Sequence, residues 1–315
     1  MPVIDVHTHM VSPAWLSLIH EHGAPRLDHR GEDVWLDGRP FMTLTRGMLD
    51  YELRIKDMDA ARVDLAILSL TCPNVYFGDE TVSVLAARTV NDEFAAAQAA
   101  WPGRIRWMAS LPWEHPAPAV AELERAVAAG AVGVMVLAQV AGRPLSDPAF
   151  APVWRAIDER ALPVLVHPGT PAPGGGGFGL AATVGFPSDT TMAVADLIYS
   201  GFFTAHPNLK LIAAHGGGAL PYLAGRLDAW WQAGHARDVL DEPPSEVMRR
   251  IHFDAITYRD DSLELCLGVA GSSNVLFGSD YPHPTGDMAG ILARVDGLTS
   301  AGAVRGGNAE RLFRL

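Results

Sequence analysis

The residues of this 315-residue chain that are best suited to chemistry are four histidines and one aspartate, each placed after a short apolar run. His7 and His9 are two positions apart after the first run, so both side chains leave the same face of an extended strand. His167 and His215 follow later apolar runs directly, and Asp280 follows another within three residues. If the runs are parallel strands of one sheet, all five side chains meet at its carboxyl edge.

Imidazole nitrogens and carboxylate oxygens are ligands that suit a divalent transition metal. We expect His7, His9, His167 and Asp280 to hold one such ion, with a water molecule completing the shell. These borderline-soft donors favour Zn²⁺, and Mn²⁺ or another divalent ion also fits. A single histidine after a strand is more often a structural group, but five such groups at four strand ends favour a site.

The elements that must position these groups alternate along the chain. Eight short apolar runs predict buried strands: Val3–Val6, Asp64–Leu70, Ile105–Leu111, Val132–Leu137, Pro163–Val166, Leu209–Ala214, Ile251–Ile256 and Val275–Phe277. Amphipathic stretches between them predict helices: Leu49–Ala60, Thr81–Ala100, Pro118–Ala129, Pro148–Arg160 and Thr190–Ser200. We expect Ser188 or Asp189 to cap the last helix and Gly201 to end it. Eight such units predict a (β/α)8 TIM barrel. An open doubly wound sheet is the rival, but no glycine fingerprint follows the first run.

Two segments interrupt the alternation. Met10–Leu49 is too long for a simple connection, and within it Val34–Phe41 predicts a small β-hairpin about an Asp-Gly turn. We interpret Met10–Leu49 as an insertion near the barrel mouth. Gly174–Gly177 predicts either a mobile lid or an ordinary surface loop. Because no linker or internal repeat divides the chain, we expect residues 1–315 to form a single domain.

The fourth apolar run limits the predicted number of metal ions. Binuclear barrels of this kind need a bridging carboxylate from the fourth strand, supplied by a carboxylated lysine or a glutamate. The run Val132–Leu137 contains neither residue type. We therefore expect one metal ion per chain.

Composition narrows the classes of partner. The chain is 49% hydrophobic, which is enough to bury a large core, and its formal net charge is −12. Without a basic stripe, this charge argues against a nucleic-acid partner. Only two cysteines are present, and neither a basic leader nor an apolar stretch of membrane-spanning length is found. We expect no disulfide, no membrane insertion and a cytoplasmic location.

Several motifs together resemble the amidohydrolase superfamily, and specifically its aminocarboxymuconate-semialdehyde decarboxylase-like branch. The resemblance extends from about Pro2 to Pro284, with Arg54–Asp59 and the insertion in the same order. The matching motifs are Val6-His7-Thr8-His9, Val166-His167-Pro168, Phe186–Thr191, Ala214–Gly218, Arg226, Phe253-Asp254-Ala255 and Gly278–Pro282. A His-X-His pair alone is weak evidence for this family, but all of these motifs in this order are specific to it.

The resemblance implies non-oxidative decarboxylation of a small unsaturated or aromatic carboxylic acid without an organic cofactor. The metal would lower the pKa of its water and polarise a substrate oxygen. His215 would be the acid/base that activates this water or moves a proton to the carbon losing CO2. The alternative for His215 is a further metal ligand.

The resemblance also suggests substrate contacts. Arg46 and Arg226 would bind the substrate carboxylate through their guanidinium forks, with Arg226 acting across a homodimer interface. The alternative role for Arg226 is a surface ion pair with Asp228 or another neighbour. The sequence departs from the family where Gly169-Thr170-Pro171 replaces an aromatic segment and His283 replaces a phenylalanine. His283 is a candidate substrate contact, or a solvent-facing histidine at the rim, and the substrate itself does not follow from the resemblance.

Two other classes of function stay open at this point. The same metal site could hydrolyse a lactone or amide or hydrate a C=C bond, with Asp280 as the base. A non-catalytic metal-binding scaffold is the third alternative. The complete ligand set with His215 beside it argues against that alternative.

Overall fold

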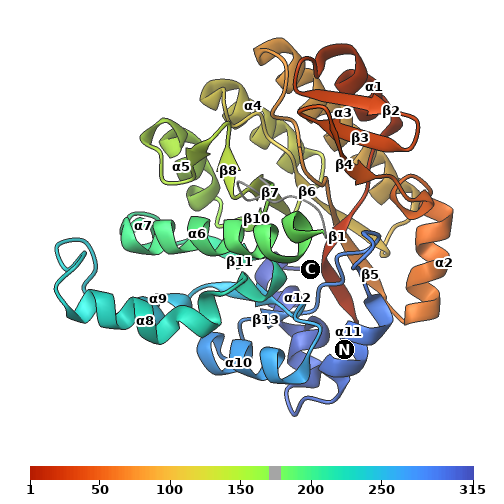
Figure 1. The fold of residues 1–315 in the computed structure, drawn as a ribbon. Coiled ribbons are helices and arrows are strands. Elements are labelled where there is room, and N and C mark those ends of the chain that lie inside the picture. Colours follow the sequence, from red (N-terminus) through yellow and green to blue (C-terminus); the bar gives the residue numbers. More distant parts are fainter. Residues whose placement is uncertain (170–178) are drawn as a thin grey trace.

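The computed structural model describes residues 1–169 and 179–315, and an eight-stranded parallel sheet lies at its centre (Figure 1). The strands follow one another around the sheet in chain order: β1 (Ile4–His9), β5 (Leu65–Ser69), β6 (Ile105–Ala109), β7 (Gly133–Leu137), β10 (Pro163–His167), β11 (Lys210–Ala213), β12 (His252–Asp254) and β13 (Val275–Leu276). The Val6 amide donates to the Phe277 carbonyl at 3.0 Å, which joins the first strand to the end of the last. The predicted (β/α)8 barrel is confirmed, and each predicted run overlaps one strand.

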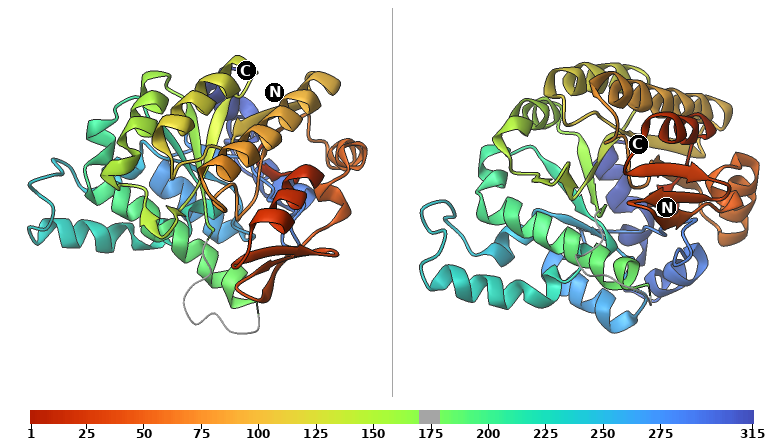
Figure 2. Two further views of the ribbon diagram at one scale, coloured as in Figure 1. Left: turned by 90° about the horizontal axis from the view of Figure 1, so that it is seen from above. Right: turned by 45° about the horizontal axis from the view of Figure 1, so that its top comes forward.

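Helices surround the barrel on its outer side, as the two views of Figure 2 show. They are α2 (Tyr51–Ala61), α3 (Glu80–Ala100), α4 (Pro116–Ala128), α5 (Ala151–Glu159), α6 (Phe186–Tyr199), α7 (Phe202–Ala205), α8 (Leu220–Gln232), α9 (Pro244–Met248), α10 (Asp260–Ala270), α11 (Met288–Asp296) and α12 (Asn308–Phe313). None of the helices in the described ranges combines the length and hydrophobicity that crossing a bilayer requires.

Two hydrophobic clusters stabilise this arrangement. The larger cluster lies between the strands and the outer helices, and a smaller one consists mainly of inward-facing strand residues such as Val6, Met135 and Leu165. Helix α12 contributes Leu312 and Phe313 to the smaller cluster. The barrel is therefore a packed core rather than a channel, and its chemistry is confined to the carboxyl ends of the strands.

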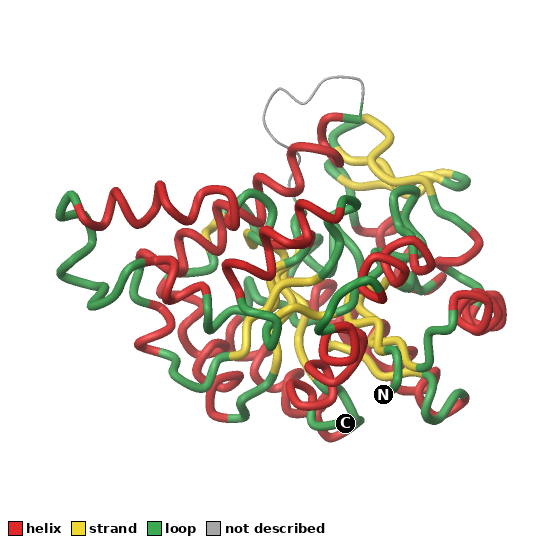
Figure 3. Tube along the Cα trace, turned by 90° about the horizontal axis from the view of Figure 1, so that it is seen from below, coloured by secondary structure: helices red, strands yellow, loops and turns green. Residues whose placement is uncertain are grey.

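The insertion after β1 is a small structured unit (Figure 3, yellow strands at the upper right). It contains α1 (Pro13–His22) and a three-stranded antiparallel sheet of β2 (Leu27–Arg30), β3 (Asp33–Leu36) and β4 (Arg39–Thr43). Strands β3 and β4 are joined through Asp37 and Gly38, whose φ angles of 48° and 77° are those of a tight hairpin turn. The segment thus contains more structure than the hairpin expected from its sequence.

Helix α6 starts earlier than its sequence suggests. It begins at Phe186, after a π-helical turn over Ala181–Gly185, so Ser188 and Asp189 lie inside the helix and the predicted N-cap is wrong. Pro187 is tolerated in the first turn because the amide it lacks would have no helical partner there. Gly201 follows the helix with a φ of 69°, as expected of a helix stop. The predicted loop Gly174–Gly177 lies outside the described residues.

A buried arginine holds the first strand against α2. Arg54 is fully buried, and its guanidinium donates to the Thr8 hydroxyl at 2.7 Å and to the His9 carbonyl. It also lies 4.7 Å from the centre of the Tyr281 ring. These contacts join the strand that carries His7 and His9 to the loop that carries Asp280. Arg54 therefore positions two parts of the site without facing it.

We expect Arg54→Met to lower the free energy of unfolding by about 3 kcal/mol, because the His9 carbonyl and Thr8 hydroxyl lose a buried charged donor. Denaturant unfolding measures this change. Arg62→Met is the matched control, since the Arg62 side chain is 78% exposed and its ion pair with Asp296 spans 3.7 Å. The control should change stability by less than about 1 kcal/mol. Equal effects of the two substitutions would contradict the positioning role of Arg54.

Candidate metal centre

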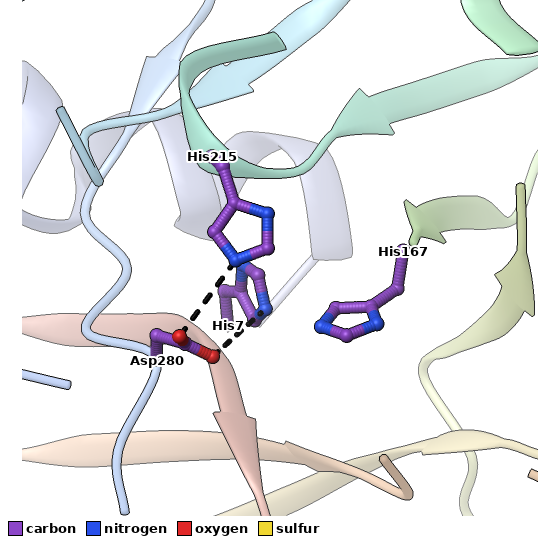
Figure 4. A group of neighbouring side chains, drawn as sticks. All are labelled: His7, His167, His215 and Asp280. Atoms are coloured by element: carbon purple, nitrogen blue, oxygen red, sulfur yellow. Dashed lines mark ion pairs between the residues drawn. The ribbon is translucent and has the colours of Figure 1, made fainter. Parts of the chain in front are cut away.

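The five side chains singled out in the sequence converge at the carboxyl end of the barrel (Figure 4 shows four of them). His7 and His9 lie near the end of β1, His167 is the last residue of β10, His215 follows β11, and Asp280 follows β13. Four are buried, and the His215 side chain is 13% exposed. Because parallel strands end at the same edge, groups from four distant segments share one small volume.

The ligand-type atoms group around Asp280. His7 Nε2 lies 3.1 Å from His9 Nε2, and Asp280 Oδ1 lies 3.3 Å from His9 Nε2. His7, His167, His215 and Asp280 offer ligand atoms that all lie within 4.8 Å of one another. A second group within the same limit contains His9, Asp280 and His283. The four predicted ligands are therefore brought together, and His215 is as close as they are.

Hydrogen bonds set which ring nitrogens are free to bind a cation. His167 Nδ1 lies 2.7 Å from the Pro168 carbonyl, which only accepts, so Nδ1 carries the proton and Nε2 is bare. His7 Nδ1 lies 2.7 Å from the Asp254 carboxylate, which leaves His7 Nε2 bare by the same argument. His167 Nε2 is buried and has no hydrogen-bond partner within the described residues. These nitrogens present lone pairs to the space beside Asp280.

Burial favours neutral imidazoles at His9 and His167 next to an ionised carboxylate. Burial would also lower the pKa of His7, but the Asp254 carboxylate outweighs it and raises this pKa. Burial lowers the pKa of His9 to about 3, and burial together with the neighbouring histidines lowers the pKa of His167 well below its usual value. Burial alone would raise the pKa of Asp280, but the neighbouring imidazoles of His215 and His9, 3.7 and 3.3 Å away, outweigh it and lower this pKa. Neutral imidazoles and a carboxylate are the forms that bind a divalent ion, so the residues present fit one.

Asp254 supports the site from beneath and was not assigned a role from the sequence. Its Oδ2 accepts from His7 Nδ1 at 2.7 Å and from the His215 amide at 2.9 Å. Its Oδ1 accepts from the Gly216 amide at 2.8 Å and the Ile256 amide at 3.1 Å. One buried carboxylate thus orients a proposed ligand and the loop of the proposed acid/base. The signal available was a carboxylate near the end of the mainly apolar run Ile251–Ile256.

We expect Asp254→Asn to weaken divalent-metal affinity roughly 10- to 100-fold, because the amide cannot accept all four of these hydrogen bonds. Competition with a fluorescent zinc chelator measures the affinity. Asp261→Asn is the control, since the Asp261 side chain is 65% exposed and pairs with Arg259 at the surface. Unchanged affinity in the Asp254 variant would show that His7 does not depend on this carboxylate.

The loops that carry His215 and Asp280 have left-handed backbone. Their φ angles are 55° and 57°, a region that non-glycine residues enter uncommonly and that clusters at functional sites. Gly217, at 73°, could not be replaced without a clash, because a Cβ there would lie 2.3 Å from the Phe253 ring. Tight packing under the loop therefore determines where His215 lies.

A cavity of about 930 Å³ opens beside these residues and is lined in part by His167, His215 and Asp280. His283 also lines it, with Nε2 3.0 Å from the Thr71 hydroxyl and its ring centre 5.1 Å from that of His9. Burial lowers the pKa of His283. His283 thus lines the cavity beside His9 and is partly exposed there.

The two arginines predicted to bind substrate, Arg46 and Arg226, lie outside the described lining of the cavity. The Arg46 side chain is 80% exposed and pairs with Asp50 at 2.9 Å. Arg226 lies on α8 beside Tyr199 and Trp230, on a surface separate from the cavity. Neither arginine contacts the cavity in the described structure. Arg226 would therefore need to bind substrate in the cavity of another copy of the chain.

The pattern of one known family extends over nearly the whole chain. The amidohydrolase family model matches residues 4–315. The chain belongs to this amidohydrolase family. A gamma-resorcylate decarboxylase of Rhizobium radiobacter is 30% identical over 308 residues, covering 89% of this chain and 92% of the relative. A 2-amino-3-carboxymuconate-6-semialdehyde decarboxylase of Dictyostelium discoideum is 28% identical over 303 residues, covering 90% and 83%. These relatives place this amidohydrolase in the branch that its motifs resembled.

The fold of this amidohydrolase also matches a solved structure. The 5-carboxyvanillate decarboxylase of Novosphingobium aromaticivorans, complexed with manganese and 4-hydroxy-3-methoxy-5-nitrobenzoic acid, is 23% identical. The match has a TM-score of 0.83 and covers 100% of this chain and 96% of the other. At this identity the likeness concerns the fold, and it supports the barrel described above.

Proposed function

We propose that this amidohydrolase is a mononuclear metal-dependent decarboxylase of a small unsaturated or aromatic carboxylic acid. The observation that carries the proposal is the convergence of His7, His9, His167 and Asp280 beside His215 at the mouth of the barrel. The names of the relatives, which are decarboxylases of related acids, support the same reaction class.

The reaction breaks the bond between the substrate carbon and its carboxylate. CO2 leaves, the electron pair stays on the carbon, and a proton takes the place of the lost group. A divalent ion held by the four proposed ligands would polarise a substrate oxygen and stabilise the developing negative charge. His215, whose Nε2 lies 3.7 Å from Asp280 Oδ2, delivers the proton from the cavity side. Asp280 lies close enough to orient this imidazole, and it would also be a ligand of the ion.

The native ion is proposed to be zinc, because three imidazoles and one carboxylate are the donor set that zinc favours. The manganese in the Novosphingobium enzyme makes Mn²⁺ the direct competitor. Chelated protein reloaded with either ion, and assayed after both are brought to equal occupancy, distinguishes the two. Higher activity with manganese at equal occupancy would count against zinc.

A screen of aromatic and muconate-type acids for CO2 release tests the reaction class. Decarboxylation predicts one CO2 for each substrate consumed, with no oxygen from ¹⁸O-labelled water in the organic product. A hydrolase or hydratase would incorporate that oxygen and release no CO2. Ring opening or hydration without CO2 would remove the decarboxylase proposal.

A homodimer is proposed as the working form. Helix α8 supports it, because Tyr222 and Trp230 are 80% and 57% exposed there, and Arg226 lies on the same helix. Light scattering at micromolar concentration tests the oligomeric state. A monomer at every concentration that retains full activity would exclude both the dimer and a role for Arg226 across subunits.

A further inference from the structure

The described lining of the cavity contains no lysine or arginine. Its carboxylate and imidazole side chains are Asp280, His167, His215 and His283. Residues 170–178 include no lysine or arginine in the sequence. Beyond the proposed metal ion, a bound molecule would therefore meet no permanently cationic side chain in the described lining.

Two arginines close to the site are already engaged. Arg54 lies behind β1, where it is fully buried and bonded to Thr8 and the His9 carbonyl. Arg259 follows the lining residue Tyr258, but its guanidinium donates two bonds to Asp261, at 3.0 and 2.8 Å. A second carboxylate on the substrate would lose its hydration without gaining a cationic partner in the described lining, which is unfavourable.

The part of the cavity away from the proposed ligands is apolar. Phe41 and Met42 reach it from the insertion, Phe186 from the first turn of α6, and Leu265 from α10. The Phe41 and Phe186 rings pack edge to face, with centres 6.5 Å apart, so the insertion contacts the helix across the cavity. This wall suits an uncharged hydrocarbon group, and the hydroxyls beside it, such as those of Thr43 and Ser262, offer an ionised group no opposite charge.

We propose that the substrate is an aromatic monocarboxylic acid whose ring carries an uncharged apolar substituent, and that diacids are excluded. This inference rests on the proposed decarboxylase function and specifies its substrate class. The single carboxylate lies at the end formed by His215 and Asp280. The substituent lies against Phe41, Phe186 and Leu265.

The test uses the metal-loaded full chain and one matched series of acids. The series is 2,6-dihydroxybenzoate carrying hydrogen, propyl or carboxylate at ring position 3 or 4, with CO2 release as the readout. In at least one position, propyl should raise kcat/KM roughly tenfold over hydrogen, since each buried methylene contributes about 0.8 kcal/mol. Carboxylate at the same position should lower kcat/KM at least roughly tenfold relative to hydrogen.

Variants test whether the apolar wall causes the preference. Leu265→Ala should reduce the advantage of propyl, and Leu85→Ala should leave it unchanged, because Leu85 is similarly exposed, at 47% against 44%, but lies on α3. A diacid preferred over the propyl acid would overturn the inference while leaving decarboxylation intact. If Arg226→Ala or Arg46→Ala then removed that preference, the arginine would have the role predicted from sequence. No CO2 from any acid would instead overturn the proposed function, and the inference with it.

Discussion

The His9→Ala variant is expected to lose its divalent ion and at least about three orders of magnitude of kcat/KM, because the ion contributes several kcal/mol to stabilising developing charge. His9 Nε2 lies 3.1 Å from His7 Nε2 and 3.3 Å from Asp280 Oδ1, so its removal opens the centre of the ligand cluster. Elemental analysis of the purified variant should find well below one ion per chain. The wild-type protein should contain about one.

The matched control is His20→Ala, because the His20 side chain is 66% exposed and pairs only with Asp28 in the described structure. Its metal content and activity should equal those of the wild type. Thermal unfolding of both variants separates metal loss from misfolding. If His9→Ala kept its ion, the ligands would instead be the group His7, His167, His215 and Asp280.

The second large effect is expected for His215→Gln. Loss of a positioned acid/base should lower kcat by roughly 10²- to 10⁴-fold while the metal content stays at the wild-type level. His215 lines the cavity and lies 3.7 Å from Asp280, and this geometry permits either proton transfer or metal binding. Activity and metal content must therefore be measured on the same preparation.

Hydrogen exchange in the product gives an independent measurement of proton transfer by His215. In D₂O the wild-type enzyme should exchange the ring hydrogen at the carbon that lost CO2, because removal of that hydrogen is the reverse of the proposed proton delivery. His215→Gln should lose this exchange along with decarboxylation. Loss of the ion in this variant would make His215 a ligand. Normal exchange with an intact ion would assign the proton transfer to another group, with His283 the nearest candidate in the cavity lining.

Much of the barrel could be predicted from sequence, since buried strands and amphipathic helices leave a local periodic pattern. Each of the eight apolar runs overlaps a strand, although β1 and β10 continue past their runs and the other strands are shorter than theirs. The start of α6 was less predictable. Ser188 and Asp189 have the side chains of an N-cap, yet Ser188 Oγ donates to the Val184 carbonyl and Asp189 accepts from the Gly169 amide, so packing rather than capping sets that boundary.

The sequence alone determined which groups stand at the strand ends, because the order of strands in a parallel barrel follows the chain and brings their carboxyl ends together. That reasoning sufficed to select His7, His9, His167, His215 and Asp280. Contacts between distant segments were decided only in three dimensions. Asp254 joins the His7 and His215 segments, and Arg54 joins β1 to the Asp280 loop. His283 lines the cavity, whereas Arg46 and Arg226 lie outside its described lining. Such contacts depend on side-chain direction and packing across hundreds of residues, which no local spacing encodes.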